Sequence, residues 1–147
     1  MKKDALKKDR ESPAEYVLDD QIGYKLRIAN QKHLEIFARE IPDVTPTQFA
    51  VLNRLLEVGQ VSQNHLGRLV GTDAATTKGV VSRLSKNGFV DVSRSTTDKR
   101  RLLISLTDKG ISATRKLIET ATRVTAMTTA KLTPKQARKL NELLAKL

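Results

Sequence analysis

One carboxylate lies among basic side chains in the polar stretch 95–101. Asp98 comes two residues before Arg100, Lys99 and Arg101 flank that arginine, and Arg94 lies just ahead of the stretch. At this spacing a carboxylate can hold a guanidinium by a bidentate pair and keep it extended. An extended arginine suits a narrow DNA minor groove, while Lys99 and Arg101 suit phosphates. The alternative is an ordinary solvated loop that carries charge.

A second group of candidate residues lies on one face of a predicted helix that follows Asp73 and runs to about Lys86. With Thr77, Val80, Val81 and Leu84 turned inward, the outward face carries Ala75, Thr76, Lys78, Gly79 and Ser82. Small side chains let a helix approach the major groove closely, and threonine and lysine can bind base edges. Further basic residues are expected to contact phosphates, namely Arg68, Arg83 and Lys86. A merely solvated face is the alternative.

This helix is the second of a predicted helix-turn-helix. Ser62 caps a short helix, Gly71 turns the chain, and Gly88 follows the end of the second helix. A β-hairpin comes next, because residues 89–94 and 102–106 are β-prone on either side of the polar loop. The pattern places Val90 and Val92 on one face of the first strand.

Longer helices are predicted on both sides of this unit. Apolar residues recur at helical spacing over about 18–40, and a capping box of Thr45 and Gln48 begins the next helix. Thr107 begins a long helix, with Ile111, Leu117, Ile118, Ala121 and Val124 turned inward. Thr133 begins a last helix that presents Ala137, Leu140, Leu143, Leu144 and Leu147. That helix is too short to be stable alone, so it needs a partner surface; docking on the same chain is the alternative.

The charge balance agrees with a nucleic-acid partner. The 147 residues include 27 Lys or Arg and 16 Asp or Glu, for a formal net charge of +11. Eight basic and three acidic residues fall in 60–105, an excess typical of proteins that meet nucleic acid. The absence of cysteine excludes disulfides and sensing by thiol oxidation. Without a run of about 18 apolar residues or an apolar leader segment, we expect a cytoplasmic protein with no membrane partner.

At residues 98–110 the chain resembles the MarR family, the multiple antibiotic resistance regulators. The family's wing signature is Asp-x-Arg, an aliphatic strand, and Leu-Thr-x-x-Gly. The matching residues are Asp98, Arg100, Ile104, Leu106, Thr107 and Gly110. The resemblance implies a mainly α fold with a small β-hairpin wing, a winged helix-turn-helix, and a homodimer built from the N- and C-terminal helices. Two-fold symmetry then predicts a pseudo-palindromic operator in double-stranded DNA.

The resemblance also implies an effector pocket near the dimer interface, for a small anionic aromatic ligand of carboxylate type. Polar or aromatic residues expected to line it are Tyr24, Arg27, His33, Phe49 and Asn53. Arg27 can pair with a carboxylate. The alternatives are a surface ion pair of Arg27 with Asp20 or another neighbour, a satisfied core role for His33, and a plain core role for Phe49. At Gly79 the chain departs from the family, whose members often carry arginine there.

The expected organisation is a flexible basic arm at 1–15 and a single domain at 16–147. Within the domain, 18–44 and 107–147 are expected to form dimerisation helices, and 45–106 the DNA-binding lobe. No enzyme activity is expected, because no phosphate-binding glycine loop or nucleophile elbow occurs. No metal site or cofactor is expected either, in a chain with no cysteine and only two histidines. The function favoured is a sequence-specific repressor released by its ligand. The alternatives are a non-specific architectural winged-helix protein, which would use the same basic face, and a winged helix that binds proteins only.

Overall fold

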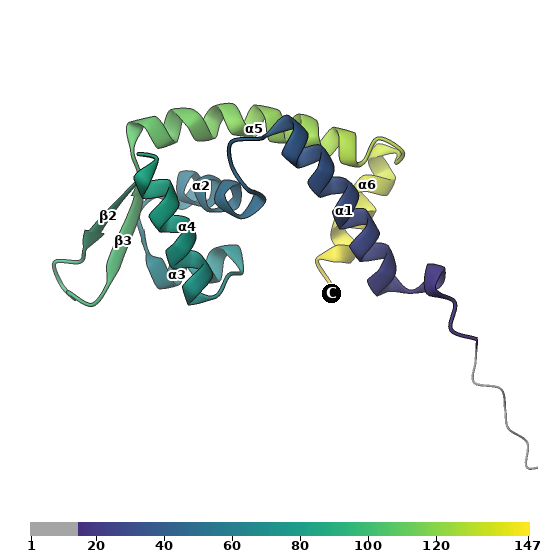
Figure 1. Ribbon diagram of the computed structural model, residues 1–147, viewed down its shortest axis with the longest axis horizontal. Helices are drawn as coiled ribbons and strands as arrows, with labels where there is room; N and C mark the ends of the chain where they lie inside the picture. Colours follow the sequence, from purple (N-terminus) through teal and green to yellow (C-terminus); the bar gives the residue numbers. More distant parts are fainter. Residues whose placement is uncertain (1–14) are drawn as a thin grey trace, which may run out of the picture. The chain divides into compact units, whose positions relative to one another are not determined.

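The computed structural model describes residues 15–147, and the predicted arm lies outside this range except for Glu15. A 3-10 turn, η1 (Leu18–Asp20), precedes α1 (Ile22–Glu40) and α2 (Pro46–Val58). The short strand β1 (Val61–Ser62) leads into α3 (Gln63–Val70) and α4 (Ala74–Lys86). Strands β2 (Val90–Arg94) and β3 (Leu102–Leu106) form the hairpin, and α5 (Asp108–Thr128) and α6 (Pro134–Leu144) complete the chain (Figure 1). Two compact units divide within α1, between Lys32 and His33.

Helices α2, α3 and α4 pack with a small sheet around one core. Its fully buried members include Leu52 from α2, Leu66 from α3, Leu84 from α4 and Ile104 from β3. The sheet is antiparallel with the order β1-β3-β2, and Ile104 pairs with Val61 on one side and Val92 on the other. This architecture confirms the predicted winged helix, a mainly helical fold with a hairpin wing.

Local side-chain caps explain where the helices α2 to α6 begin. Thr45 and Thr133 each form a complete capping box with the glutamine three residues later, and a proline occupies the first turn of both helices. Ser62, Asp73 and Thr107 cap α3, α4 and α5 through single side-chain oxygens. Each cap satisfies backbone N–H groups that have no partner within the helix. All five predicted caps are confirmed.

A second buried cluster joins the C-terminal half of α1 to α5. Phe37, Ile41, Val44 and Val124 form it, and Phe49 packs against it. Along α5, Val124 is buried as expected, whereas Ile111, Leu117, Ile118 and Ala121 are only half-buried. The buried Gly110 and Thr114 were not expected to face inward. Thr114 satisfies its hydroxyl by donating to the carbonyl of Gly110 at 2.7 Å, which makes its burial tolerable.

The sheet differs from the sequence-based expectation in one strand, and burial along β2 is uneven. Strand β1 was not predicted, because a two-residue strand has no periodicity and exists only through its pairing with β3. Val90 and Val92, predicted to share one face of the strand, are two residues apart in β2, but Val92 is 41% exposed while Val90 is 2% exposed. The reason is that β2 lies at the edge of the sheet, and only its first residue is buried.

Candidate nucleic-acid interface

The outward face of α4 carries small and polar side chains. Thr77, Val80, Val81 and Leu84 are buried, as the sequence predicted. The opposite face leaves exposed the predicted set Ala75, Thr76, Lys78, Gly79 and Ser82, with Arg83 and Lys86 in the last turn. A Cβ added at Gly79 would meet no atom within 4 Å. The helix therefore offers a surface without bulky obstruction, as close approach to a groove requires.

The start of α4 is anchored by Asp73. Its Oδ1 accepts a hydrogen bond from the backbone N–H of Thr76 at 2.7 Å. The hydrogen bonds from Thr76, the backbone one first, lower the pKa of Asp73 below its ordinary value of 3.8. The carboxylate is the form that accepts these bonds, so the cap stabilises the charged side chain.

The turn between α3 and α4 depends on close packing at Gly67. Gly71 ends α3 in the left-handed region, with φ of 72° and ψ of 35°. Thr77 Oγ1 donates to the carbonyl of Asp73 at 2.7 Å and lies 2.7 Å from Thr72 Oγ1. A Cβ at Gly67 would lie 2.8 Å from Thr77 Oγ1 and 3.2 Å from the Thr72 carbonyl. The absence of a side chain at Gly67 therefore permits the observed approach of α3 and α4.

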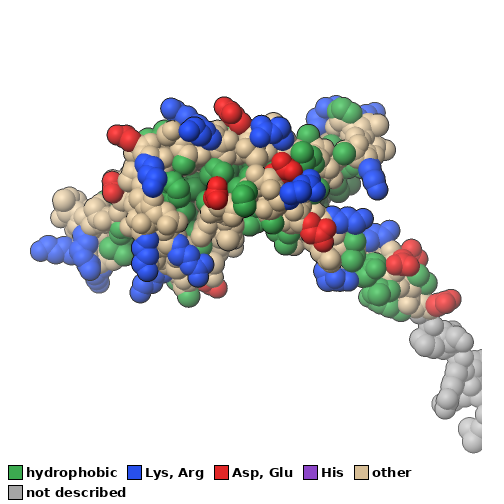
Figure 2. All heavy atoms as spheres, turned by 45° about the horizontal axis from the view of Figure 1, so that its top comes forward, with side chains coloured by type: hydrophobic (Ala, Val, Ile, Leu, Met, Phe, Trp, Pro, Cys, Tyr) green, Lys and Arg blue, Asp and Glu red, His purple; other side chains and the backbone are tan. Residues whose placement is uncertain are grey.

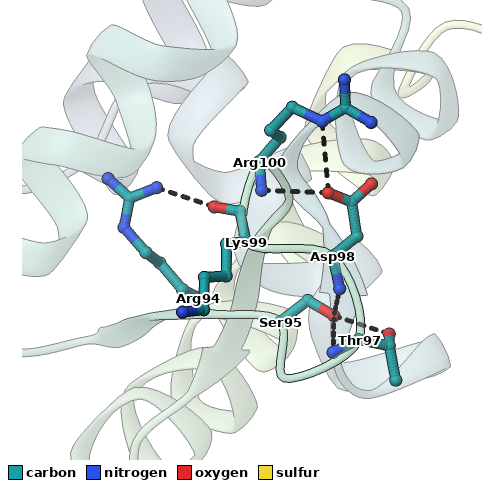
Figure 3. A network of polar contacts seen from close by, with 6 residues as sticks. All are labelled: Arg94, Ser95, Thr97, Asp98, Lys99 and Arg100. Atoms are coloured by element: carbon teal, nitrogen blue, oxygen red, sulfur yellow. Dashed lines mark hydrogen bonds and ion pairs between the residues drawn. The ribbon is translucent and has the colours of Figure 1, made fainter.

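The wing loop is closed by its own hydrogen bonds (Figure 3). The hydroxyl of the buried Ser95 accepts from the N–H groups of Thr97 and Asp98, both at 3.3 Å. The Ser95 N–H donates to the carbonyl of Arg101 at 2.9 Å, across the mouth of the loop. Arg94 Nη1 donates to the Lys99 carbonyl at 2.8 Å, so Arg94 braces the loop from β2. The loop is thereby held in one shape although its side chains are polar.

Asp98 and Arg100 are paired, but the geometry differs from the predicted bidentate fork. Arg100 donates its backbone N–H at 3.0 Å and its Nε–H at 3.4 Å to the same Asp98 atom, Oδ1. The bond from the Arg100 backbone N–H to the aspartate side chain two residues earlier is a local turn that aspartate favours. This bond occupies Oδ1, one of the two oxygens that a bidentate pair would need. The Arg100 side chain remains 93% exposed. Both terminal guanidinium nitrogens therefore face solvent.

A polar pocket of about 300 Å³ lies between α3 and the wing. Arginines from both sides line it, Arg68 from α3 and Arg100 with Arg101 from the wing loop. Gln63 and Asn64 in the first turn of α3 also line the pocket. Sequence reasoning missed these two amides, although the Ser62 cap that begins α3 marks their position. Figure 2 shows Lys and Arg side chains gathered around the wing and the neighbouring helices.

The residues predicted to bind an effector divide between the two compact units. Tyr24 and Arg27 lie in the first unit, where the Arg27 guanidinium carbon is 5.5 Å from the centre of the Tyr24 ring. Arg27 is exposed. Among the ion pairs of residues 15–147, none joins Arg27 to Asp20. This contradicts the Asp20 form of the surface-pair alternative for Arg27.

The other three predicted effector residues lie in the second unit, on α1 and α2. His33 Nδ1 is 2.9 Å from Thr128 Oγ1, and its ring centre is 6.3 Å from that of Phe37. Phe37 in turn is 6.3 Å from Phe49. Asn53 is directed along its own helix, where its Nδ2 donates to Glu57 at 3.1 Å. His33 and Phe49 thus belong to one aromatic row with Phe37 between them, and Asn53 is a separate contact.

Within residues 15–147, no group of three or more His, Asp or Glu side chains is arranged to hold a metal ion. In the same part of the chain, no helix combines the length and apolar character needed to cross a membrane.

Comparison with known proteins places this geometry in a family. The model of the MarR family matches residues 44–102, which run from the end of the α1–α2 loop to the start of β3. The HTH-type transcriptional repressor NicR of Pseudomonas putida is 31% identical over 119 residues, which cover 80% of this chain and 75% of NicR.

Two solved structures extend the similarity over almost the whole chain. A probable transcriptional regulator from Pseudomonas aeruginosa is 44% identical with a TM-score of 0.84, covering 88% of this chain and 98% of its own. BpsR of Bordetella bronchiseptica, whose DNA binding is regulated by 6-hydroxynicotinic acid, is 32% identical with a TM-score of 0.86, covering 90% and 96%. The chain belongs to the MarR family and is a DNA-binding transcription regulator of the winged helix-turn-helix type.

Proposed function

We propose that this regulator is a homodimeric, sequence-specific repressor that leaves its operator when a small anionic aromatic ligand binds. The observation that carries the proposal is that two candidate DNA-binding surfaces, the exposed face of α4 and the wing, occur in the same lobe. The exposed face of α4 is small and polar, and the wing beside it carries an arginine that is 93% exposed and held by Asp98. A helix face with small side chains fits the major groove, and an extended arginine fits a narrow minor groove, so together they can contact both grooves of DNA.

The contacts with DNA divide by chemistry. Ala75, Thr76, Lys78 and Ser82 face the base edges of the major groove, and Arg100 enters the adjacent minor groove. The remaining basic side chains contact phosphates, which fixes the register of the lobe without reading sequence. They are Arg68, Arg83, Lys86, Lys99 and Arg101, with Arg94 bracing the wing from behind.

Dimerisation involves residues 18–44 and 107–147, while 45–106 form the DNA-binding lobe of a single domain at 16–147. The support is the uncovered apolar surface of α6, where Leu140, Leu143 and Leu144 are each more than 40% exposed. Ile22 and Leu18, near the start of α1, are more than half exposed as well. Apolar surface of this extent is stabilised by burial against a second copy. Two reading helices related by two-fold symmetry then lie about 34 Å apart, one turn of DNA.

The ligand is an aromatic acid recognised through Arg27 and the aromatic side chains. Arg27 and Tyr24 already place a guanidinium beside an aromatic ring, a pair that can hold a carboxylate and a planar ring together. BpsR responds to 6-hydroxynicotinic acid, which is an aromatic acid of this kind. His33, Phe49 and Asn53 are the other residues that we propose for ligand contact. Release from DNA follows as a population shift, in which the ligand favours a state whose two reading heads no longer match the operator.

The first experiment is selection of bound fragments from random genomic DNA at about 0.15 M salt, followed by sequencing. An enriched inverted repeat, with half-sites one helical turn apart, is the expected result. Steeply salt-dependent retention without any shared motif would instead indicate the architectural alternative and would contradict the proposal. The enriched operator then serves for a screen of aromatic acids that release the protein.

A further inference from the structure

Three consecutive carbonyls after α4 each accept a hydrogen bond from the start of α5. Lys109 Nζ donates to the Asn87 carbonyl at 2.8 Å, and Thr107 Oγ1 donates to the Gly88 carbonyl at 2.6 Å. The Thr107 N–H donates to the carbonyl of Phe89 at 3.0 Å. We call this set of five residues the α4–α5 clasp. In Figure 1 the end of α4 and the start of α5 lie side by side, as these bonds require.

The carbonyls of the clasp are presented by a tightly formed helix end. Gly88 has φ of 76°, and the N–H groups of Gly88 and Phe89 donate to Ser85 and Leu84, both at 3.0 Å. These two bonds form the Schellman arrangement that closes many helices. Because the arrangement is rigid, a group that binds its carbonyls holds the helix as well as the loop.

Lys109 is the side chain that fits this position by both charge and shape. Its Nζ lies 5.1 Å from the centre of the Phe89 ring and bonds the Asn87 carbonyl. A positive charge is stabilised at the C-terminal end of a helix, where the backbone dipoles leave partial negative charge. Its Cδ and Nζ both lie 3.7 Å from the point where a Cβ on Gly88 would stand. The Lys109 side chain, from its aliphatic part to its ammonium group, therefore lies across the C-terminal end of α4.

From this geometry we propose that Lys109 is a positioning residue for DNA reading. It fixes the C-terminal end of α4 to α5, and so sets the angle at which α4 presents Thr76, Lys78 and Ser82, without touching DNA itself. The inference rests on the proposed function of α4 as the reading helix. Hydrogen bonds to base edges weaken steeply with distance and angle. A small tilt of α4 therefore costs selective contacts, whereas it leaves the attraction between surface charges and phosphates unchanged.

The test compares three variants with the full-length wild-type chain: Lys109→Met, Lys109→Arg, and the control Lys116→Met, which removes an exposed lysine elsewhere on α5. The probes are the operator duplex from the genomic selection and a random-sequence duplex of equal length. Lys109→Met is expected to bind the operator about 10-fold more weakly at fixed salt, as loss of one good base contact would. Its affinity for the random duplex and its salt slope stay at wild-type values. Lys109→Arg restores operator affinity, because it can still donate to the Asn87 carbonyl.

A measurement without DNA tests whether Lys109 holds the C-terminal end of α4 in place. Amide hydrogen exchange in residues 84–90 rises in Lys109→Met and returns to wild-type values in Lys109→Arg. The inference is overturned if Lys109→Met binds the operator as the wild type does. It is overturned too if the random duplex is bound more weakly and the salt slope falls by about one, since that pattern marks a direct phosphate contact. If the wild type itself shows no sequence selectivity, the proposed function fails, and the inference fails with it.

Discussion

The backbone N–H and the Nε–H of Arg100 both donate to Oδ1 of Asp98, at 3.0 Å and 3.4 Å. One carboxylate oxygen thus orients both the backbone and the inner nitrogen of the guanidinium group, while the two terminal nitrogens face solvent. An arginine prepared in this way loses less conformational entropy when it enters a groove than an unrestrained one. The following predictions start from this pair.

Replacing Arg100 by alanine should weaken operator binding by about 10- to 100-fold at 0.15 M salt, because the proposed minor-groove contact is lost. Fluorescence anisotropy with a labelled operator measures the change. Arg138→Ala removes a guanidinium from α6, which carries no proposed DNA contact, and serves as the control. Affinity that stays at the wild-type value in Arg100→Ala would remove the wing from DNA recognition.

Gly110→Ala should destabilise the fold by about 3 kcal/mol or more, the range of severe overpacking. The added Cβ would stand 2.0 Å from the Phe89 carbonyl oxygen, within backbone that cannot move aside freely. The matched variant is Gly79→Ala, which meets nothing within 4 Å. It should stabilise the protein by about 0.5–1 kcal/mol, because alanine favours the helix. Urea denaturation of both variants measures the difference, and equal midpoints would contradict the packing seen at Gly110.

Deleting residues 133–147 should yield monomers or unfolded chain, because the exposed leucines of α6 are then lost from the proposed interface. Sedimentation velocity ultracentrifugation measures the assembly state. The double variant Leu140→Glu with Leu143→Glu keeps the helix and charges its apolar face, so it should dissociate the dimer as well. Lys135→Glu on the same helix is the control. A stable dimer after the deletion would place the interface elsewhere.

Arg27→Ala should abolish ligand-induced release while operator binding stays intact, once an active aromatic acid is found. The reason is that the carboxylate loses its charged partner. Operator binding is titrated with and without the acid in both proteins, and Arg39→Ala provides a matched loss of one exposed arginine from α1. Retained release in Arg27→Ala would assign the carboxylate contact to another residue.

The cap of α4 should give stability a pH dependence of known sign. The pKa of Asp73 is lowered on folding, so its charge stabilises the native state above pH 3.8, and this contribution is lost as the pH falls through the lowered pKa. Asp73→Asn keeps a capping oxygen but no charge. Wild type and variant should therefore differ in unfolding free energy near neutral pH and converge at low pH. Urea denaturation across the acid range checks this, and a constant difference would contradict it.

Local chemistry made most of the fold predictable. The caps at Thr45, Ser62, Asp73, Thr107 and Thr133 act within a few residues, and the inward face of α4 follows from its own periodicity. Features that depend on residues far away in the chain could not be predicted from the sequence. Strand β1 exists only through β3, and the burial of Gly110 depends on the Phe89 carbonyl.

The candidate site shows the same division between local and distant information. Arg100 and Asp98 are close in the chain, so their pairing was foreseen, whereas the competing backbone bond to Oδ1 was not. Gln63 and Asn64 were missed because their role depends on a wing that comes some forty residues later in the chain. The proposed interface between chains leaves only an indirect trace in one sequence, the apolar face of α6, which stays partly exposed among the residues that the structure describes.

The closure of the wing loop by Ser95, Arg94 and the Arg101 carbonyl has a consequence for engineering. Since these bonds lie within the loop, the conformation of its tip depends mainly on the loop itself and on the two paired strands that carry it. Residues 96–100 can then be exchanged for those of a relative while the frame at 94, 95 and 101 is retained. If the wing binds the minor groove as proposed, such chimeras would alter minor-groove preference without changing α4, so the two proposed DNA contacts could be redesigned separately.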